Sequence, residues 1–322
     1  MALNILITGA LGHVGSALIR AYAKREDVSL IRMLDNLSTQ RYCSLFNLPE
    51  GKKYQFIEGD INNLEILKKA MKDIDVVIHL AAIADATYAM AHPEETEKIN
   101  LLGTQNVLNM AIEAGVKKFI FPSTTSVYGE AEGTFDENSL NEVYKPVGPY
   151  AECKRKAEKI VQESNGKNGI QTFVIRKGTI FGKSIGMRFH TAINKFSYLT
   201  AINKPLTVWD SALDSIRPYL GINDATNAYE FIEKYGKPGE IYNVLTKNYL
   251  MREIIDCVKK SSPEVKIEIV PSPLANQKPF QISNEKIKKL GFEFKDDLAQ
   301  SIKDTVELFR KVHYSGIDNQ NL

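Results

Sequence analysis

A regular alternation of short apolar runs with longer amphipathic runs is the feature that most constrains how this chain folds. The apolar runs cover residues 3–8, 29–34, 54–58, 76–80 and 119–122, and the amphipathic runs between them cover 14–24, 64–71 and 94–114. Short, nearly continuous apolar runs are typical of strands buried on both faces, and apolar residues three or four apart are typical of helices. Because helices that alternate with strands connect parallel strands, the pattern predicts an α/β fold with a parallel sheet.

The second half of the chain is less regular. We predict helices at 150–164, 222–235, 251–260 and 298–312, and strands at 171–175, 206–209, 241–244 and 266–270. The stretch after Gly178 is rich in loops, residues 271–279 contain three prolines and are predicted to form a loop, and the tail after His313 is expected to be frayed.

The first predicted strand runs directly into a turn that contains Gly9, Gly12 and Gly15. Glycines between a strand and a helix permit a tight turn, close approach of the backbone to a pyrophosphate, and close packing of the helix on the strand. The free N–H groups at the start of the helix favour phosphate. The GxxGxxG spacing departs from GxGxxG, and such a turn can also be an ordinary strand–helix connection.

Polar and small residues at the ends of the next strands support a dinucleotide site. Asp35 closes the second strand, 20 residues after Gly15, where a carboxylate can accept both ribose hydroxyls and would repel a 2′-phosphate, so NAD is favoured over NADP. Asp60 follows the third strand, and the small residues Ala81 and Ala82 follow the fourth. Arg32 and Arg41 keep NADP open, and Asp35 could simply begin a turn.

Tyr150 and Lys154 are four residues apart and share one face of a predicted helix. A tyrosine hydroxyl has a pKa of about 10, and a neighbouring ammonium group is expected to lower it. Tyr150 could then take a proton from an alcohol, and the Ser/Thr run at 123–126 could supply a second hydroxyl. A YxxxK pair alone is weak evidence for an active site. The ordered set of motifs from the glycine turn to Tyr-Lys is strong evidence.

In this order the motifs resemble those of the extended short-chain dehydrogenase/reductase family, in its NAD-dependent nucleotide-sugar epimerase/dehydratase branch. The matching stretches include TGALGHVGS, GDI, HLAA, STTSVYGE, PYAECK and IRPYLGINDA, spread over nearly the whole chain. The resemblance implies a Rossmann-type doubly wound parallel sheet over residues 1–178, to which segments around 217–246 return. It also implies a smaller C-terminal α/β lobe, mainly residues 179–322, that binds a nucleotide-diphosphate sugar.

The resemblance also implies a role for each matched residue. The catalytic residues would be Thr124, Tyr150 and Lys154, and no metal site is expected. The residues expected to contact NAD are Gly9, Gly12, His13, Val14, Gly15, Asp35, Asn36, Asp60, Ile61, Leu80, Ala81, Ala82, Asn100, Ser123, Tyr150, Lys154 and Lys177. The residues expected to contact the substrate are Thr124, Thr125, Tyr150, Thr179, Arg188, Asn194 and Arg217.

Two departures from the family pattern bear on the reaction. Family members that are 4,6-dehydratases carry an acidic pair where this chain has Thr125 and Ser126, so elimination is less expected. The second departure concerns the placement of the substrate, because Thr179 stands where many members have an asparagine that contacts the sugar nucleotide. We therefore expect a nucleotide-sugar 4-epimerase that oxidises C4 transiently. The alternative is a 4-dehydrogenase or ketoreductase with net redox turnover; a dehydratase, a decarboxylase or a non-catalytic NAD-binding protein is less favoured.

Composition limits which partners and which cellular compartment we expect for the protein. The 41 basic and 39 acidic residues give no reason to expect a nucleic-acid or membrane partner. The cysteines, Cys43, Cys153 and Cys257, form no CxxC pair, so we expect reduced thiols and a cytoplasmic protein. The family resemblance implies a homodimer formed through the helices at 94–114 and 150–164.

Overall fold

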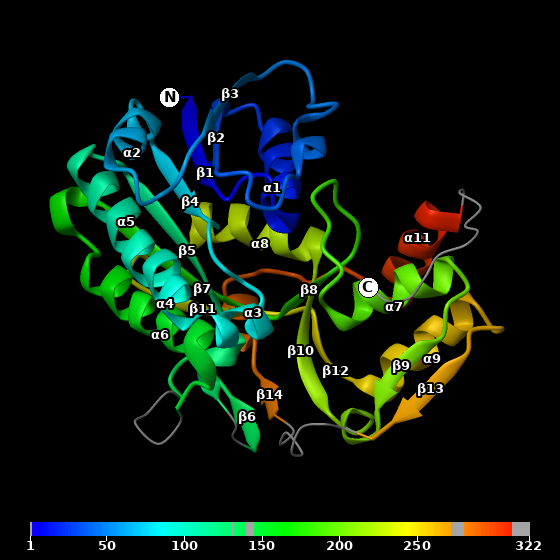
Figure 1. Ribbon diagram of the computed structural model, residues 1–322. Coiled ribbons are helices and arrows are strands. Elements are labelled where there is room, and N and C mark those ends of the chain that lie inside the picture. The colour runs from blue at the N-terminus through cyan, green and yellow to red at the C-terminus, as the bar shows by residue number, and fades with distance from the viewer. Residues whose placement is uncertain (1, 130–131, 140–144, 272–279, 311–322) are drawn as a thin grey trace.

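A seven-stranded parallel sheet forms the centre of the computed structural model, which describes residues 2–129, 132–139, 145–271 and 280–310 (Figure 1). Its strand order is β11-β7-β5-β4-β1-β2-β3. The bounds are β1 Leu3–Thr8, β2 Val28–Asp35, β3 Lys53–Glu58, β4 Val76–His79, β5 Lys118–Thr124, β7 Gln171–Lys177 and β11 Ile241–Val244. All neighbouring strands run parallel, so the predicted α/β class with a parallel sheet is confirmed.

Helices cover both faces of this sheet, because both faces of its strands are apolar. On one face, α1 (His13–Ala23) and α8 (Ile222–Tyr235) share a core with the strands. On the other face lie α2 (Leu64–Met71), α5 (Gly103–Glu113) and α6 (Gly148–Glu163). The doubly wound, Rossmann-like arrangement is thus confirmed. Cys153 lies in the second core and is 4% exposed.

The predicted helix at 94–114 is divided into three parts. It comprises α4 (Pro93–Glu97), a π-helical turn (Lys98–Leu102) and α5, and the short α3 (Ala86–Ala91) precedes it. Single π-helical turns inside helices are frequent at functional sites, because the extra residue turns a side chain in a new direction. Here the turn carries Asn100, one of the predicted site residues.

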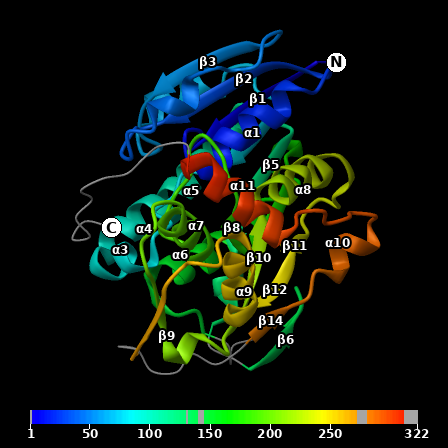
Figure 2. The ribbon, with the colours of Figure 1, turned by 90° about the vertical axis from the view of Figure 1, so that its right-hand side faces the viewer.

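The rest of the chain builds a smaller lobe beside the carboxyl ends of the central strands (Figure 1). A three-stranded sheet contains β8 (Thr179–Phe181), β10 (Ile216–Gly221) and β12 (Lys247–Leu250), and a two-stranded sheet pairs β9 (Leu206–Trp209) with β13 (Ile267–Val270). Helices α7 (Ala192–Ala201), α9 (Met251–Ser261) and α11 (Leu298–Arg310) share the apolar core of the lobe, and α11 faces the viewer in Figure 2. Two further strands, β6 (Gly133–Phe135) and β14 (Phe280–Ile282), pair with each other, and α10 is Glu285–Lys289.

The strands and helices predicted in the first half agree with the structure to within a few residues. The loop-rich stretch predicted between Gly178 and the strand at 206–209 instead contains β8 and α7, and β10, which follows that strand, was not predicted. The predicted loop at 271–279, apart from residue 271, and the tail after His313 lie outside the described residues. Within the described part of the chain, no helix combines the length and the apolar character needed to span a bilayer.

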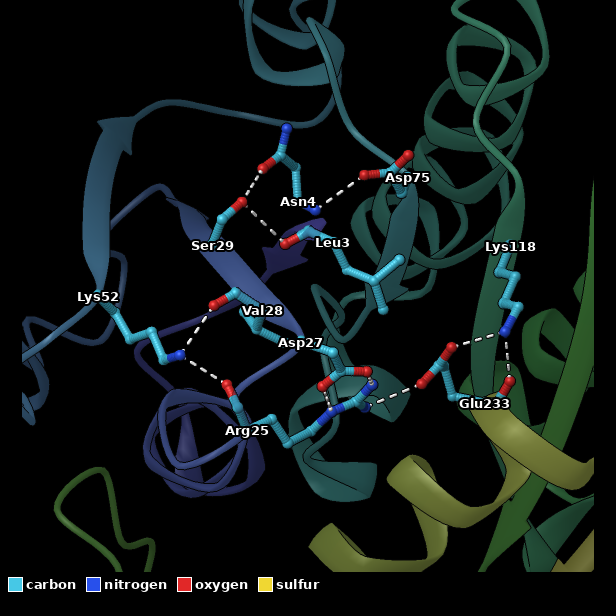
Figure 3. Close-up of polar contacts among 10 residues, drawn as sticks. All are labelled: Leu3, Asn4, Arg25, Asp27, Val28, Ser29, Lys52, Asp75, Lys118 and Glu233. Carbon is cyan, nitrogen blue, oxygen red and sulfur yellow. Dashed lines mark hydrogen bonds and ion pairs between the residues drawn. The ribbon is translucent and has the colours of Figure 1, made fainter. Parts of the chain in front are cut away.

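A buried ion network joins the amino ends of two central strands to α8 (Figure 3). Glu233 of α8 accepts hydrogen bonds from Arg25, just before β2, at 2.8 Å and from Lys118, at the start of β5, at 2.6 Å. Arg25 also pairs with Asp27. The network lies at the edge of the sheet opposite to the carboxyl ends of the strands, so it supports the fold without touching the candidate site.

Candidate active site

The glycine turn between β1 and α1 is too crowded for side chains at two of its three glycines. A β-carbon at Gly9, whose φ is +62°, would lie 2.6 Å from the backbone N of Ala81, and one at Gly15 would lie 2.4 Å from the carbonyl O of Ala10. Gly12 is the residue before α1, and no side chain caps the helix there. The turn therefore brings bare backbone and an uncapped helix start to the carboxyl edge of the sheet, which is what a pyrophosphate group needs.

A short segment, residues 182–188, crosses this turn, and we call it the strap; it is part of the green segment between β8 and α7 in Figure 1. The Nε2 of His13 lies 2.9 Å from the carbonyl O of Gly182, and the N–H of Gly186 donates to Oγ of Ser16 at 2.9 Å. A β-carbon at Gly186 would lie 2.3 Å from the carbonyl O of Leu11. The strap is thus fastened to the start of α1.

His13 uses its side chain to hold the strap. It is 5% exposed, and burial lowers the pKa of its imidazole to about 4, so the ring is neutral at physiological pH. A neutral ring that donates from Nε2 has an acceptor at Nδ1, and this atom has no hydrogen-bond partner among the described residues. Val14, the next residue, is half-buried at the first turn of α1.

Asp35 lies at the end of β2 with its carboxylate fixed by two backbone groups. One oxygen accepts from the N–H of Leu11 at 3.0 Å and the other from the N–H of Leu37 at 2.9 Å. The carboxylate is half-buried at the edge of the glycine turn, in the position predicted for a ribose-binding group. The Nδ2 of the adjacent Asn36 is 3.4 Å from Asp60 Oδ2.

The two arginines that kept NADP open lie in different places. Arg32 is buried and donates to the carbonyl oxygens of Ala70 and Lys72, so it is not available to a 2′-phosphate. Arg41 reaches within 3.9 Å of where a β-carbon of Gly12 would be, so its guanidinium lies beside the glycine turn. The sequence pattern placed Arg41 only near the cofactor, because α1 and β2 separate it from the turn along the chain.

A cleft of about 600 Å³ opens beside Asp60. Its lining includes Asn62, Asn63, Glu95 and Lys98. Asp60 Oδ1 accepts from the backbone and side chain of Asn62, and Ile61 is buried against Gly103. The cleft borders Asp60, which is predicted to contact the adenine ring.

The loop after β4, which carries Leu80, Ala81 and Ala82, is held by two hydrogen bonds. Asn100 accepts from the N–H of Ile83 and donates to its carbonyl O, both at 2.8 Å. The side chain of Asn100 is fully buried and holds this loop, and its predicted contact with NAD stays a prediction. The three loop residues themselves are half-buried and available.

Tyr150 and Thr124 meet at the carboxyl edge of the sheet. Burial raises the pKa of the Tyr150 phenol, while a hydrogen bond with Thr124 and the charge of Arg188 act in the opposite direction. Thr124 ends β5, and its Oγ1 also lies 3.1 Å from Oγ of Ser126. The predicted lowering of the Tyr150 pKa by Lys154 is wrong for the protein by itself; Arg188 is the cation that acts on the phenol.

Two lysines lie close to this pair. Lys154 is 3% exposed, donates to the carbonyl O of Pro122 at 3.0 Å, and lies 4.6 Å from the ring centroid of Phe121. Burial and the charge of Lys177 lower the pKa of Lys154 to about 7. Burial and the charge of Arg188 lower the pKa of Lys177 to about 8.

The hydroxyls of the Ser/Thr run have different surroundings. Ser123 is fully buried, and its Oγ has no hydrogen-bond partner among the described residues. Thr125 is buried, whereas Ser126 is exposed. An unpaired buried hydroxyl and a crowded glycine turn at the same edge fit a dinucleotide whose nicotinamide end reaches β5.

The predicted substrate residues are only partly brought together. Arg188 ends the strap, its Nε is buried without a partner in the described chain, and Thr179 is exposed at the start of β8. Asn194 is 1% exposed and holds the strap through Gly182 N and Arg188 O, and its predicted substrate contact stays a prediction. Arg217 is on β10, and its guanidinium lies over the ring of Phe280.

Comparisons with known proteins agree with this geometry. The sequence profile of the NAD dependent epimerase/dehydratase family matches residues 5–244. A mouse dTDP-D-glucose 4,6-dehydratase is 32% identical over 327 residues, covering 96% of this chain and 89% of the relative. The chain belongs to the NAD-dependent epimerase/dehydratase family. The resemblance drawn from the sequence motifs is confirmed, and the protein is an NAD-dependent enzyme of this family.

Solved structures of the family share the fold. A UDP-glucuronic acid 4-epimerase from Bacillus cereus superposes with a TM-score of 0.85 at 25% identity, covering 96% of this chain and 99% of the other. DesIV, a dTDP-glucose 4,6-dehydratase from Streptomyces venezuelae, has a TM-score of 0.84 at 22% identity, with 96% and 97% covered. Epimerases and dehydratases both occur among the relatives, so membership of the family does not decide between the reactions.

Proposed function

We propose that this epimerase/dehydratase family member is a nucleotide-sugar 4-epimerase. The observation that carries the proposal is the set of hydroxyls at the end of β5. Thr124 shares a hydrogen bond with Tyr150, and the two positions that follow carry Thr125 and Ser126 rather than carboxylates. The site is thus equipped to handle the proton of an alcohol and lacks, at these positions, the acid–base pair that elimination between C5 and C6 requires.

NAD would be held along the carboxyl edge of the sheet. Its pyrophosphate would lie against Gly9, Gly12, His13, Val14 and Gly15, its adenosine against Asp35, Asn36, Asp60 and Ile61, and its nicotinamide end against Leu80, Ala81, Ala82, Ser123, Tyr150, Lys154 and Lys177. When bound, NAD supplies a reversible two-electron oxidation of the sugar carbinol.

The residues of the chain manage the proton of the sugar hydroxyl. Tyr150 accepts the O4 proton as the alcohol becomes a ketone and returns it when the alcohol is restored, and Thr124 hydrogen bonds to the same oxygen. Arg188 favours the phenolate form of Tyr150 because its charge lowers the pKa of the phenol. The ketone then presents its other face before reduction, which inverts C4.

We infer that the two parts of the molecule divide the ligands between them. Residues 1–178, together with α8 and β11, would bind NAD, and the lobe formed mainly by 179–322 would bind the nucleotide-diphosphate sugar. Arg188 and Arg217 would contact the diphosphate, since a guanidinium offers several donors to phosphate oxygens. We expect a cytoplasmic homodimer formed through α4–α5 and α6; light scattering that gives a monomer mass at micromolar concentration would contradict the dimer.

The products formed from a panel of UDP-, dTDP-, GDP- and CDP-sugars test the proposal. We expect a C4 diastereomer, detected by NMR, with no net NADH absorbance. A 4-keto-6-deoxy sugar would contradict the proposal in favour of a dehydratase. Stoichiometric NADH would contradict it in favour of a 4-dehydrogenase.

Replacing the phenol tests the role of Tyr150. Tyr150→Phe removes only the hydroxyl, and we expect kcat to fall by about 10³-fold because general base catalysis contributes on the order of 10²–10⁴. NAD binding, followed by thermal stabilisation, should change little. Unchanged turnover of an accepted sugar nucleotide would contradict the assignment.

A further inference from the structure

Arg176 is a buried arginine that joins elements on which the candidate active site is built. It is the next-to-last residue of β7, is 2% exposed, and pairs in register with Ser123 of β5. Its guanidinium donates to both carboxylate oxygens of Glu158 in α6, at 2.8–3.2 Å. Glu158 comes four residues after Lys154 and eight after Tyr150, so the three side chains share one face of α6.

The same guanidinium holds a second element of the site, a short 3₁₀ helix at Thr125–Tyr128. It donates from Nη1 to the phenol oxygen of Tyr128 at 2.9 Å. That oxygen also lies 2.9 Å from the carbonyl O of Asp136 and 2.8 Å from Oδ1 of Asn243. Because an arginine can only donate, the phenol proton goes to one of these two acceptors. Burial raises the pKa of Tyr128 to about 12, so this hydroxyl keeps its proton at neutral pH and is no base.

The start of the 3₁₀ helix holds the hydroxyl of Thr124. The Oγ1 of Thr124 accepts from the N–H of Ser126 at 3.1 Å and lies 3.1 Å from Oγ of the same serine. The end of the 3₁₀ helix is fixed in the protein, because Val127 and Tyr128 are both fully buried. A displaced Tyr128 would therefore shift the serine, and with it the Thr124 oxygen that hydrogen bonds to Tyr150.

The buried pair of Arg176 and Glu158 has a geometric value that an apolar pair would lack. Both side chains are 3% exposed. Charges that leave water lose their hydration, and well-packed apolar residues in their place are often equally stable or more stable. A guanidinium that binds both oxygens of a carboxylate, however, fixes the distance and the direction between the groups it joins. The pair therefore fixes α6, which carries Tyr150, relative to β7 and the 3₁₀ helix.

We propose that Tyr128 and Arg176 are positioning residues of the active site. They set where the hydroxyl of Thr124 lies relative to the phenol of Tyr150. This inference rests on the proposed function, in which these two hydroxyls act on the same sugar oxygen, and it holds for whichever nucleotide sugar is the substrate.

Tyr128→Phe tests the inference, because it removes only the hydroxyl that Arg176 holds. With an accepted nucleotide sugar we expect kcat to fall about tenfold and KM to change less than about twofold, since a misplaced catalytic group slows the reaction more than it weakens binding. Tyr242→Phe is the matched control. The hydroxyl of Tyr242 accepts from the N–H of Lys237 at 2.8 Å, in the segment before β11. Its loss should leave kcat within about twofold of the wild type.

A double-mutant cycle separates positioning from a general structural effect. Thr124→Val removes the hydroxyl through which Tyr128 is proposed to act. In the Thr124→Val background, Tyr128→Phe should lower kcat by less than about a further twofold, because residues that act through each other are not additive. The same roughly tenfold loss in both backgrounds would contradict action through Thr124.

The ¹³C NMR signal of Tyr150 Cζ, in protein labelled at this atom of tyrosine, gives a readout without turnover. Its absence in Tyr150→Phe assigns it. Since Cζ carries the phenol oxygen, its chemical shift responds to the hydrogen bond with Thr124. We expect the signal to move in Tyr128→Phe and to stay in place in Tyr242→Phe.

Three further results would overturn the inference while leaving the proposed function intact. They are a kcat of Tyr128→Phe within about twofold of the wild type, equal losses of kcat in Tyr128→Phe and Tyr242→Phe, and a Tyr150 signal that does not move in Tyr128→Phe. If the wild type converts no nucleotide sugar, the proposed function fails instead. The NMR signal then decides by itself whether Tyr128 places the Thr124 hydroxyl.

Discussion

At the residue scale, Lys154 illustrates a conflict between stability and chemistry. It is almost fully buried, has no ion pair with a carboxylate in the described part of the chain, and its pKa falls from 10.5 to about 7. A group that gives up its proton on folding makes the folded state less stable wherever the unfolded chain would hold that proton. The site therefore retains a lysine that weakens the fold at neutral pH.

Lys154→Met should make the protein without NAD more stable, by an amount that depends on pH. Between about pH 7 and pH 10.5 the unfolded chain binds more protons at this position than the folded one, so the stability of the wild type rises with pH through this window. The gain in unfolding free energy of Lys154→Met over the wild type should be largest at pH 6 and decrease toward pH 10. Urea unfolding at both pH values measures it.

Lys159→Met is the matched control, because that lysine is exposed on the same helix. The unfolding free energy of Lys159→Met should differ little from that of the wild type, and the difference should not change with pH. A Lys154→Met advantage that stays constant from pH 6 to pH 10 would contradict the buried, partly neutral lysine.

The sequence predicted which residues meet at the site better than it predicted their electrostatics. Asp35, Thr124 and Tyr150 lie at strand ends or on a helix start, and local patterns fix such positions. The pKa of Tyr150 depends on burial and on Arg188, which reaches the site from a loop far along the chain. No local pattern contains that information.

At the scale of elements, the three glycines of the turn have separable tasks. Gly15 is packed against the backbone of Ala10, whereas a β-carbon at Gly12 would have only ordinary contacts, 3.4 Å or more from its neighbours. Gly15→Ala should cost about 2 kcal/mol of unfolding free energy through overpacking. Gly12→Ala should cost less than about 1 kcal/mol but weaken NAD binding at least tenfold, because the pyrophosphate needs the bare backbone.

Urea unfolding without NAD and NAD titration, run on both variants, check this division of tasks. If Gly12→Ala unfolds as easily as Gly15→Ala, the packing argument fails. If Gly12→Ala binds NAD as well as the wild type, the glycine turn is not the pyrophosphate site.

The elements that the sequence missed are short or interrupted. β8 has three residues, too few for a period-two pattern to be recognised, and β10 contains Pro218, which cannot donate to a neighbouring strand. The strap has no periodicity at all, and its position depends on contacts with His13 and Ser16 more than 160 residues earlier. Long apolar strands of the central sheet were predictable because burial on both faces leaves a continuous signal.

At the scale of the whole molecule, Glu233 ties the central sheet to α8 (Figure 3). Its side chain is 2% exposed and pairs with both Arg25 and Lys118. Removing one partner of a buried ion network leaves the other charges uncompensated, which is far more damaging than losing an exposed pair.

Glu233→Gln should therefore lower the unfolding free energy by about 3 kcal/mol, measured in urea. Turnover by the folded enzyme at low temperature should stay near the wild-type value, because the network lies at the edge of the sheet opposite to the site. Glu163→Gln, in an exposed pair with Lys159, should change stability by less than about 0.5 kcal/mol. Equal stability of the two variants would contradict a structural role for the network.

The return of β11 to the central sheet also has a consequence for synthesis on the ribosome. When residue 178 has been made, β1, β2, β3, β4, β5 and β7 exist, yet the edge of β7 that pairs with β11 is bare. An uncovered strand edge readily pairs with another chain. A nascent polypeptide halted before residue 241 would therefore be prone to aggregate. The ribosome must synthesise all the elements from β8 to α8 before β11 can cover that edge.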